Sequence, residues 1–599
     1  MAADERQKEE NKSKTAAVPF SADPIHKGHI DIIRRAKEEL GFREVHAAIL
    51  ENPSKKSRHT FSLEERMDMA RKCLSHIAGA KVVSFKGLLV DYAYEQMIED
   101  VIKGVRNEED LKYETLLREV NDSQIRGIKH HLIKARPELA HISSTVVKAI
   151  EEAQGFTHEY VPLYVKQCLE ARMSSHYIVG ITGEIVTGKS YVTDKLIEIG
   201  KKRGMAAYNL DLDEIGHDIL EKLQQPRYVW VREELGKCFG KEIMDEKNCV
   251  NRKVLGEIVF SALPRLEKLN RVMELPMEVR MRRELLENKG LIFFNAALIA
   301  ESEKNYICNN NLILVTADKQ SKERRLKLKN LTPEQIARRL GSQYNNAGKA
   351  AKLRSFISAE GYGNLWVLDN SDNSDPRNLE KLFDDIINKM DIYGELRFMG
   401  LWNRLGADGS YEAAYTRIRE ELAKPHRYYH TLNHVVRMLN AFDEVKDQIQ
   451  NPDMVEFSIW THDYCYAEKS KVNEEKSADF AYKLCKEAQL AEEFAKGVHK
   501  LNIVTKHNLM PANTDEAFMI DLDLLILGES DEAFDEYDDK IKQEYGWIPE
   551  EQYRTGRIAV LESFLAKGDN LYHTDYFRSK YEAQARENLE RAVEKLRGC

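Results

Sequence analysis

The sequence lacks any long hydrophobic run: no apolar stretch approaches the roughly 18 residues that a membrane-spanning helix requires. Its eight cysteines include no CxxC pair and form no small disulfide framework, so we expect reduced thiols, no cysteine-bound zinc and a cytoplasmic location. The opening residues, MAADERQKEENKSK, lack the apolar core of a signal peptide and are too acidic for a transit peptide. We predict a disordered leader over residues 1–14.

The chain also lacks an excess of basic residues. Its net charge is −9, and charged residues make up 32% of the composition. This balance provides no general attraction to nucleic acid or to an anionic membrane, so we expect neither as a partner. Any anionic ligand must be held by local basic groups.

The length of 599 residues predicts three or four domains. No internal repeat is present, but the pattern starts afresh at several points. Residues 15–173 and 176–392 alternate short apolar runs with amphipathic helical patterns, as parallel α/β sheets require, whereas residues 394–599 contain helical patterns throughout. We therefore predict a multidomain protein with two α/β domains followed by an all-α domain.

The first motif is PFSADPIHKGH, which places His26 and His29 where the first strand passes into the first helix. A helix N-terminus carries unpaired N–H groups and a partial positive charge, so it suits phosphate. Histidines there can donate hydrogen bonds to phosphoryl oxygens. The alternative is that the two histidines merely cap a turn.

The motif HxGH is followed in order by NPSKK, FSLEERMDMAR, FKGLLVDYA, VIKGVRNEEDLKYE, ISSTVVK and EYVP. With these segments, the first domain resembles bacterial-type phosphopantetheine adenylyltransferase. The resemblance implies a Rossmann-like nucleotidyltransferase domain that uses ATP and 4′-phosphopantetheine. It implies that His29 stabilises the transition state, that His26 contacts the triphosphate and that Lys55 binds the substrate phosphate. It further implies a substrate and nucleotide site formed by Ser21, Lys103, Arg106, Glu114, Ser143, Ser144 and Thr145.

Three positions depart from the family pattern. Phe20 and Ala22 stand where the family has glycine and phenylalanine, and Lys103 replaces an arginine. A Cβ at the glycine position would crowd the backbone near phosphate, and lysine lacks the bidentate fork of arginine. We expect activity with altered affinity.

The second domain opens with GEIVTGKS between a predicted strand and a predicted helix, the context of a phosphate-binding loop. Gly183 and Gly188 would let the backbone cradle phosphate, Lys189 would reach the β- and γ-phosphates, and Ser190 would ligate Mg²⁺ accompanying ATP. The alternative is a chance glycine-rich turn. About twenty residues on, an aspartate in NLDLDE could orient the attacking hydroxyl, although the same carboxylates would also serve as helix N-terminal caps.

With VNRKVLGEIVF, FFNAALIAE, LTPEQIARRLGSQ and VLDNSD in order, this domain resembles dephospho-CoA kinase, in the form fused behind the adenylyltransferase in eukaryotic coenzyme A synthase. The resemblance implies Asp213 as the catalytic carboxylate, with Asp211 behind it, and phosphate binding by Arg252, Arg338 and Arg339. Three residues depart from the family: Glu184 and Val186 in the loop, and Asn295 where an aspartate is usual. The carboxylate of Glu184 would lie close to bound phosphates, so a slow or retargeted kinase is an open alternative.

The helical domain carries histidine and aspartate residues at separate points of the sequence. His430 and His434 lie one helical turn apart, His462 and Asp463 form an HD pair, and Asp523 follows in MIDLDLLILG. Because no single helix offers enough ligands, a metal site requires these segments to pack together. The alternative is a set of polar residues on helix surfaces.

The helical domain contains, in order, the segments YYHTLNHVVRML, THDYCY, NEEKSA, TKHN, DLDLLILG, YRTGRIAVLESFL, LYHT and EAQARENL. With these segments, it resembles over its whole length the predicted HD-superfamily metal-dependent phosphohydrolases. The resemblance implies a divalent transition metal held by His434, His462, Asp463 and Asp523, with His430 as a general acid and Asp463 orienting water. It identifies neither the metal nor the substrate.

Together these features predict the last two steps of coenzyme A biosynthesis, with dephospho-CoA as the intermediate, joined to a hydrolase. A rival hypothesis keeps the adenylyltransferase and makes the kinase and HD regions nucleotide-binding regulatory modules. A third assigns the first domain another phosphorylated acceptor. The sequence does not determine the oligomeric state.

Overall fold

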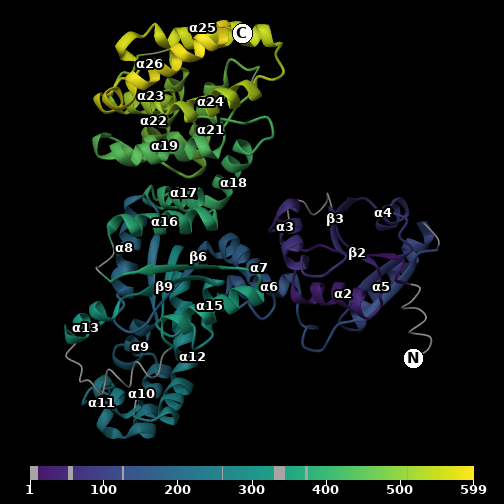
Figure 1. Cartoon of the computed structure of the whole chain (residues 1–599). Helices are drawn as coiled ribbons and strands as arrows, with labels where there is room; N and C mark the ends of the chain where they lie inside the picture. Colours follow the sequence, from purple (N-terminus) through teal and green to yellow (C-terminus); the bar gives the residue numbers. More distant parts are fainter. Residues whose placement is uncertain are drawn as a thin grey trace. The chain divides into compact units, whose positions relative to one another are not determined.

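The computed structural model describes residues 11–51, 59–124, 127–259, 261–328, 344–371, 375–467, 469–508 and 510–598. It contains two parallel α/β sheets followed by a region made of helices, so the predicted fold class is confirmed (Figure 1). The chain divides into two compact units, residues 1–197 with 207–382, and residues 198–206 with 383–599.

The first sheet has five parallel strands in the order β3-β2-β1-β4-β5. The strands are β1 (Thr15–Phe20), β2 (Glu44–Glu51), β3 (Ala80–Lys86), β4 (Asp100–Val105) and β5 (Lys129–Lys134). The helices of this part are α2 (Lys27–Glu38), α3 (Leu63–Leu74), α4 (Leu89–Glu95), α5 (Glu108–Gln124), α6 (Ser144–Glu152) and α7 (Leu163–Leu169), followed by η2 (Glu170–Ser174). The strand order reverses between β1 and β4, and such a switch point opens a crevice at the carboxyl ends of the strands.

The second sheet also has five parallel strands, in the order β10-β9-β6-β8-β7. Its strands are β6 (His176–Thr182), β7 (Ala207–Asp211), β8 (Gly290–Asn295), β9 (Asn311–Thr316) and β10 (Asn364–Asp369). Its helices are α8 (Lys189–Lys202), α9 (Leu212–Glu221), α10 (Pro226–Phe239), η3 (Lys241–Ile243), α11 (Arg252–Val259), α12 (Leu263–Glu287), η4 (Lys304–Cys308), α13 (Lys319–Leu328), α15 (Asn346–Glu360) and α16 (Pro376–Met390). Every residue of β6 and β8 is buried, which explains their continuous apolar sequences.

The C-terminal unit is helical. Its long helices are α17 (Tyr393–Arg404), α18 (Tyr411–Leu422), α19 (Leu432–Val445), α20 (Pro452–Thr461), α21 (Asn473–Glu487), α22 (Glu492–Ile503), α23 (Thr514–Leu524), α24 (Asp531–Glu544), α25 (Glu550–Leu565) and α26 (Asp575–Gly598). Short helical turns are η5 (Lys446–Gln448), η6 (Val504–Lys506), η7 (Leu525–Gly528) and η8 (Gly568–Asn570). Within the described ranges, no helix combines the length and apolar character needed to cross a membrane.

A buried ion-pair network joins α17, α19 and α20 within this unit. The Arg397 guanidinium, 1% exposed, donates from Nε to Glu456 at 2.6 Å and from NH1 and NH2 to Asp443 at 2.7 and 2.9 Å. Arg404, which is about one-third exposed, donates to the other oxygen of Glu456 at 2.7 Å. The two arginines therefore share one carboxylate but differ in burial.

Arg397→Met should destabilise the C-terminal unit by about 3–5 kcal/mol, because it leaves buried carboxylates without their main partner. Arg404→Met is the matched control and should cost no more than about 1 kcal/mol, as expected for a solvent-exposed ion pair. Urea unfolding followed by hydrogen exchange in peptides from residues 393–460 would measure both. Equal losses in the two variants would contradict this account of the network.

Candidate functional site

The HxGH segment lies at the switch point of the first sheet, directly after β1. His26 is the N-cap of α2, and its backbone N–H donates to Nδ1 of His29 at 3.4 Å. Because Nδ1 of His29 accepts this bond, the proton of the neutral ring lies on Nε2. A Cβ on Gly28 would lie 3.0 Å from Nδ1 of His26, so a larger residue there would have to displace that ring.

Both imidazoles are neutral at neutral pH. Burial, assisted by the positive charge of Arg106, lowers the pKa of His26 to about 4. Burial together with His26 and Arg106 lowers the pKa of His29 well below its usual value. His29 is therefore placed to act as a neutral hydrogen-bond donor through Nε2.

The departure at Phe20 has a structural consequence. The Phe20 ring, at the end of β1, stacks on His29 with centroids 4.7 Å apart, and His29 stacks on His26 at 3.6 Å. Ala22 occupies the left-handed region at φ 52° and is completely buried. The aromatic ring is thus supplied from position 20, where it holds His29 from one side.

The remaining residues predicted for this site have varied surroundings. Arg106 follows β4 and forms a bidentate pair with Asp110 at 2.7 and 3.0 Å. Nζ of Lys103 lies 3.4 Å from Oε1 of Glu114. Ser143 caps α6 by accepting from Val146 N–H at 3.2 Å.

Ser144, Ser21, Thr145 and Lys55 complete the set of residues predicted for this site. The hydroxyl of Ser144 donates to the carbonyl of Pro24 at 2.9 Å, whereas Ser21 and Thr145 are exposed. Lys55 lies outside the described residues.

Asp23 connects the HxGH turn to two other segments, a role the sequence did not suggest. Its carboxylate accepts from the N–H groups of Thr60 and Phe61 at 3.1 and 2.9 Å, and from Lys148 Nζ at 2.9 Å. These contacts hold the pKa of Asp23 below its usual value, despite burial acting in the opposite direction. The turn before His26 is therefore anchored to α6 through Lys148.

The segment GEIVTGKS, predicted to be a phosphate-binding loop, lies between β6 and α8. Gly183 and Gly188 have φ values of 157° and 90°, and a Cβ on either would meet Val315 O at 2.3 Å or Asn370 Nδ2 at 2.2 Å. The amino group of Lys189 donates to the carbonyls of Gly183 and Glu184 at 3.3 and 3.2 Å. Ser190 is exposed on the first turn of α8.

The two unusual residues of the loop differ in their environment. Glu184 is 6% exposed, and its carboxylate accepts from Lys322 Nζ at 2.5 Å and from Asn346 N–H at 2.7 Å. Its negative charge is therefore paired. Val186 has φ 58°, a left-handed conformation that a β-branched residue adopts only at an energetic cost.

The carboxylates after β7 have distinct positions. Asp211 caps α9 by accepting from the N–H groups of Asp213 and Glu214 at 2.8 and 3.3 Å. Asn295, at the end of the neighbouring strand β8, donates to its other oxygen at 3.1 Å. An aspartate in place of Asn295 would set two carboxylates together, so this departure provides a donor for Asp211. Asp213 is exposed on the first turn of α9.

The predicted phosphate-binding arginines of this domain fall partly outside the structure. Arg252 begins α11 and pairs with Glu221 at 2.7 Å. Arg338 and Arg339 lie outside the described residues.

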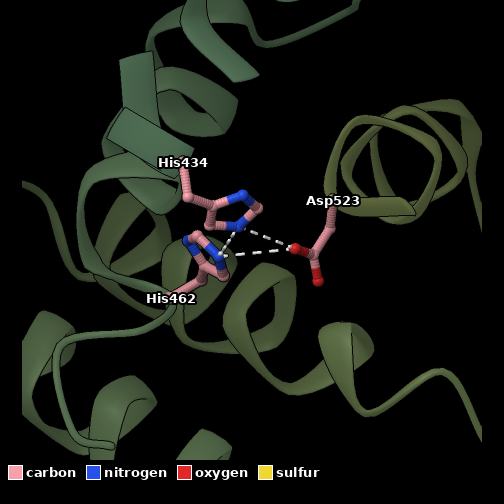
Figure 2. A group of neighbouring side chains, drawn as sticks. All are labelled: His434, His462 and Asp523. Carbon is pink, nitrogen blue, oxygen red and sulfur yellow. Dashed lines mark hydrogen bonds and ion pairs between the residues drawn. The ribbon is translucent and has the colours of Figure 1, made fainter. Parts of the chain in front are cut away.

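In the helical unit, the structure brings together three of the four predicted metal ligands, His434, His462 and Asp523 (Figure 2). Nε2 of His434, on α19, lies 3.2 Å from Nε2 of His462, at the end of α20, and 3.1 Å from Oδ1 of Asp523, on α23. Asp463 Oδ2 lies 3.1 Å from Nε2 of His462 and 3.8 Å from Nε2 of His434. The carboxylate of Asp463 thus lies beside the two histidines of this group.

These residues fit a divalent transition metal. Nδ1 of His462 bonds the carbonyl of Ile459 at 3.0 Å, so the neutral ring presents a lone pair from Nε2 toward the other ligands. Burial alone would lower the pKa of His462, but Asp463 and Asp523 raise it well above its usual value, so a cation binding here would displace a proton from Nε2. Convergence of imidazole nitrogens with carboxylate oxygens is the donor chemistry of such a cation.

Two residues beside this cluster were not assigned from the sequence. His507 lies in the TKHN segment, and its Nε2 lies 2.9 Å from Oδ2 of Asp523, the oxygen turned away from His434. Glu544 bonds Nδ1 of His430 at 2.7 Å. The signal for His507 was present in its motif, whereas nothing near Glu544 in the sequence marks it.

Comparisons with known proteins assign two regions of the chain. A family model described as cytidylyltransferase-like matches residues 21–150, and a model of dephospho-CoA kinase matches residues 177–362. The chain therefore contains a nucleotidyltransferase-like domain and a dephospho-CoA kinase domain, which support a role in coenzyme A biosynthesis. Neither match extends into the helical unit.

Two solved structures resemble parts of the chain. TT1252 from Thermus thermophilus is 24% identical, with a TM-score of 0.28, over 36% of this chain and 97% of its own. A NadR protein in complex with NAD and AMP-PNP is 12% identical, with a TM-score of 0.22, over 63% of this chain and 97% of its own.

Val186→Gly should relieve the backbone strain in the phosphate-binding loop and raise the free energy of unfolding locally by about 1 kcal/mol. Val186→Ala keeps a Cβ in the left-handed region and should give a smaller gain. Hydrogen exchange in peptides spanning residues 176–202 would measure the difference. The strain assignment is wrong if the glycine variant is no more protected than wild type.

Proposed function

We propose that the chain catalyses adenylyl transfer from ATP to 4′-phosphopantetheine, then 3′-phosphorylation of dephospho-CoA, and that its helical unit is a metal-dependent phosphohydrolase. The observation that carries the first activity is the neutral His29, with its Nε2 proton available at the switch point of a parallel sheet. The matches to the two family models support the nucleotidyltransferase and kinase classes.

In the first reaction, a phosphate oxygen of 4′-phosphopantetheine attacks the α-phosphorus of ATP. The bond to the bridging oxygen breaks, and pyrophosphate leaves. Nε2–H of His29 donates to the α-phosphoryl oxygen, where negative charge develops, and His26 contacts the triphosphate. Phe20 restrains the imidazole by stacking, so the donor needs no reorganisation as charge develops.

In the second reaction, the ribose 3′-hydroxyl of dephospho-CoA attacks the γ-phosphorus of ATP and ADP leaves. Asp213 accepts the hydroxyl proton, and Asp211, held by Asn295, orients the first turn of α9 that carries Asp213. Lys189 would turn from the loop carbonyls to the β- and γ-phosphates, and Ser190 would hold the Mg²⁺ that accompanies ATP. Because Glu184 is paired with Lys322, its charge opposes phosphate binding less than the sequence suggests.

In the helical unit, His434, His462, Asp463 and Asp523 would hold the metal. A divalent cation bound there lowers the pKa of a coordinated water molecule and polarises a phosphoryl group. His507 supports Asp523 from its outer oxygen. His430, which lies beside the ligands but bonds Glu544, is left to protonate the leaving group.

The two transferase sites can be separated by mutation. His29→Ala should lower kcat for formation of dephospho-CoA by about 10²-fold or more while ATP still binds, because the lost hydrogen bond acts mainly in the transition state. Lys189→Ala should abolish conversion of dephospho-CoA to coenzyme A and leave its formation unchanged. Chromatographic separation of the two products from the full chain with ATP, Mg²⁺ and 4′-phosphopantetheine measures both effects.

The same assay decides between this proposal and the regulatory-module hypothesis. Wild-type protein that binds ATP at both sites and accumulates dephospho-CoA without making coenzyme A would favour regulatory modules. Near-normal turnover in His29→Ala would show that the HxGH segment has another role.

The metal assignment predicts different outcomes for neighbouring residues. Asp463→Ala removes a charged ligand and should reduce the metal content of the full chain, whereas His430→Ala should keep the metal and lose only hydrolytic turnover. Elemental analysis and thermal unfolding, with and without chelator, would measure this, since a metal that binds only the folded state stabilises it. Full metal content in folded Asp463→Ala would contradict the ligand set.

A further inference from the structure

Glu544 is a completely buried carboxylate at the end of α24, outside the set of metal ligands. Its Oε1 accepts from the backbone N–H groups of Tyr428, Tyr429 and His430 at 2.8, 2.8 and 3.1 Å. Its Oε2 bonds Nδ1 of His430 at 2.7 Å and the hydroxyl of Tyr466 at 2.8 Å. Five donors therefore surround one carboxylate, and three of them come from consecutive residues.

The three backbone donors determine what this carboxylate does to His430. They keep Oε1 occupied as an acceptor, and an ionised carboxylate offers only acceptor oxygens to the ring. The proton between Oε2 and the imidazole therefore lies on Nδ1 of His430. Nε2 is the ring nitrogen that remains for a ligand, and it has no hydrogen-bond partner among the described residues.

The ring is also restrained in orientation. His430 stacks on Tyr466 with centroids 4.2 Å apart, and the Tyr466 hydroxyl bonds the same Oε2. A carboxylate and an aromatic face thus hold the imidazole from two directions.

Arg427 ties this arrangement to the metal ligands. Its guanidinium donates to the carbonyls of His430, Asp463 and Tyr464 at 3.1, 2.7 and 2.7 Å. The segment that carries His430 and the segment that carries Asp463 are consequently held side by side. The expectation that His430 and His434 share one helix is wrong, because His430 precedes the N-cap of α19, Thr431, and only His434 lies on the helix. Their ring centroids are nevertheless 6.1 Å apart.

We infer that Glu544 is the positioning residue that fixes the proton of His430 on Nδ1, so that Nε2 delivers a proton to the leaving group. This role rests on the proposed phosphohydrolase function. A water oxygen forms a bond to phosphorus and releases a proton to solvent. As the bond between phosphorus and the leaving oxygen breaks, the imidazolium transfers its Nε2 proton to that oxygen. The neutral ring keeps its Nδ1 proton on Glu544 and regains the Nε2 proton from solvent.

Glu544→Gln tests this role with little change in shape. The three backbone N–H groups still require an oxygen, so the new amide nitrogen would face Nδ1 of His430 and donate to it. Nδ1 then becomes an acceptor, and the proton of the neutral ring moves to Nε2. Tyr466→Phe is the matched control, because it removes another bond to Oε2 but leaves the bond to His430.

The tautomer can be observed without any reaction. Long-range ¹H–¹⁵N spectra of the metal-free full chain, labelled at histidine, should show Nδ1–H for His430 in wild type and Tyr466→Phe, and Nε2–H in Glu544→Gln. Loss of the signal in His430→Gln assigns it. At a pH where the ring is neutral, Nε2–H in place of Nδ1–H in wild type would overturn the inference even if the glutamine variant fails to fold.

The catalytic consequence depends on the leaving group. With Mn²⁺-loaded full chain, Glu544→Gln and His430→Gln should lower kcat about 10²-fold on phenyl phosphate and much less on p-nitrophenyl phosphate, because p-nitrophenolate departs without a proton. The metal content should match that of wild type in both variants.

The outcomes separate the two proposals. Equal losses on both esters, or loss of metal in Glu544→Gln, would make Glu544 only an anchor for the loop and overturn its positioning role. Hydrolysis of neither ester by wild type would contradict the hydrolase function itself, while the tautomer measurement would still decide where Glu544 places the proton.

Discussion

Each candidate site depends on the requirement that a carboxylate removed from water be surrounded by donors. Asp23 gathers two backbone N–H groups and Lys148 around the HxGH turn. Asp211 caps α9 and takes a bond from Asn295 on the next strand. Glu544 takes three consecutive backbone N–H groups and the ring of His430. In each case the carboxylate orders the segment that carries the proposed chemistry.

This arrangement separates positioning from reaction. The residues proposed to touch substrate, His29, Asp213 and His430, each lie next to a restrained segment and keep a polar atom available. The restraining groups are more deeply buried and use their oxygens on the protein itself. Because these side chains are already held in place, they need little reorganisation when charge develops in the reaction. Such preorganised groups stabilise the transition state more than the bound substrate.

The departures from the family patterns become intelligible in the same terms. Phe20 provides a ring that stacks on His29, and Asn295 provides a donor where a second carboxylate would repel Asp211. Glu184 is neutralised by Lys322 and by the N–H of Asn346. Val186 and Ala22 both keep the cost of a left-handed backbone, which is larger for the β-branched Val186.

The sequence alone determined the two α/β domains and the helical region, because alternating apolar runs, glycines and helical periodicity act over a few residues. It also placed the GEIVTGKS loop between β6 and α8 and pointed to the four residues proposed as metal ligands. It did not indicate Glu544, which lies 114 residues from His430, or the bond from Asn295 to Asp211 across 84 residues. Those pairings form only when helices and strands pack, because burial is what makes a carboxylate require hydrogen-bond donors. The local sequence pattern does not indicate which distant donors will lie beside it.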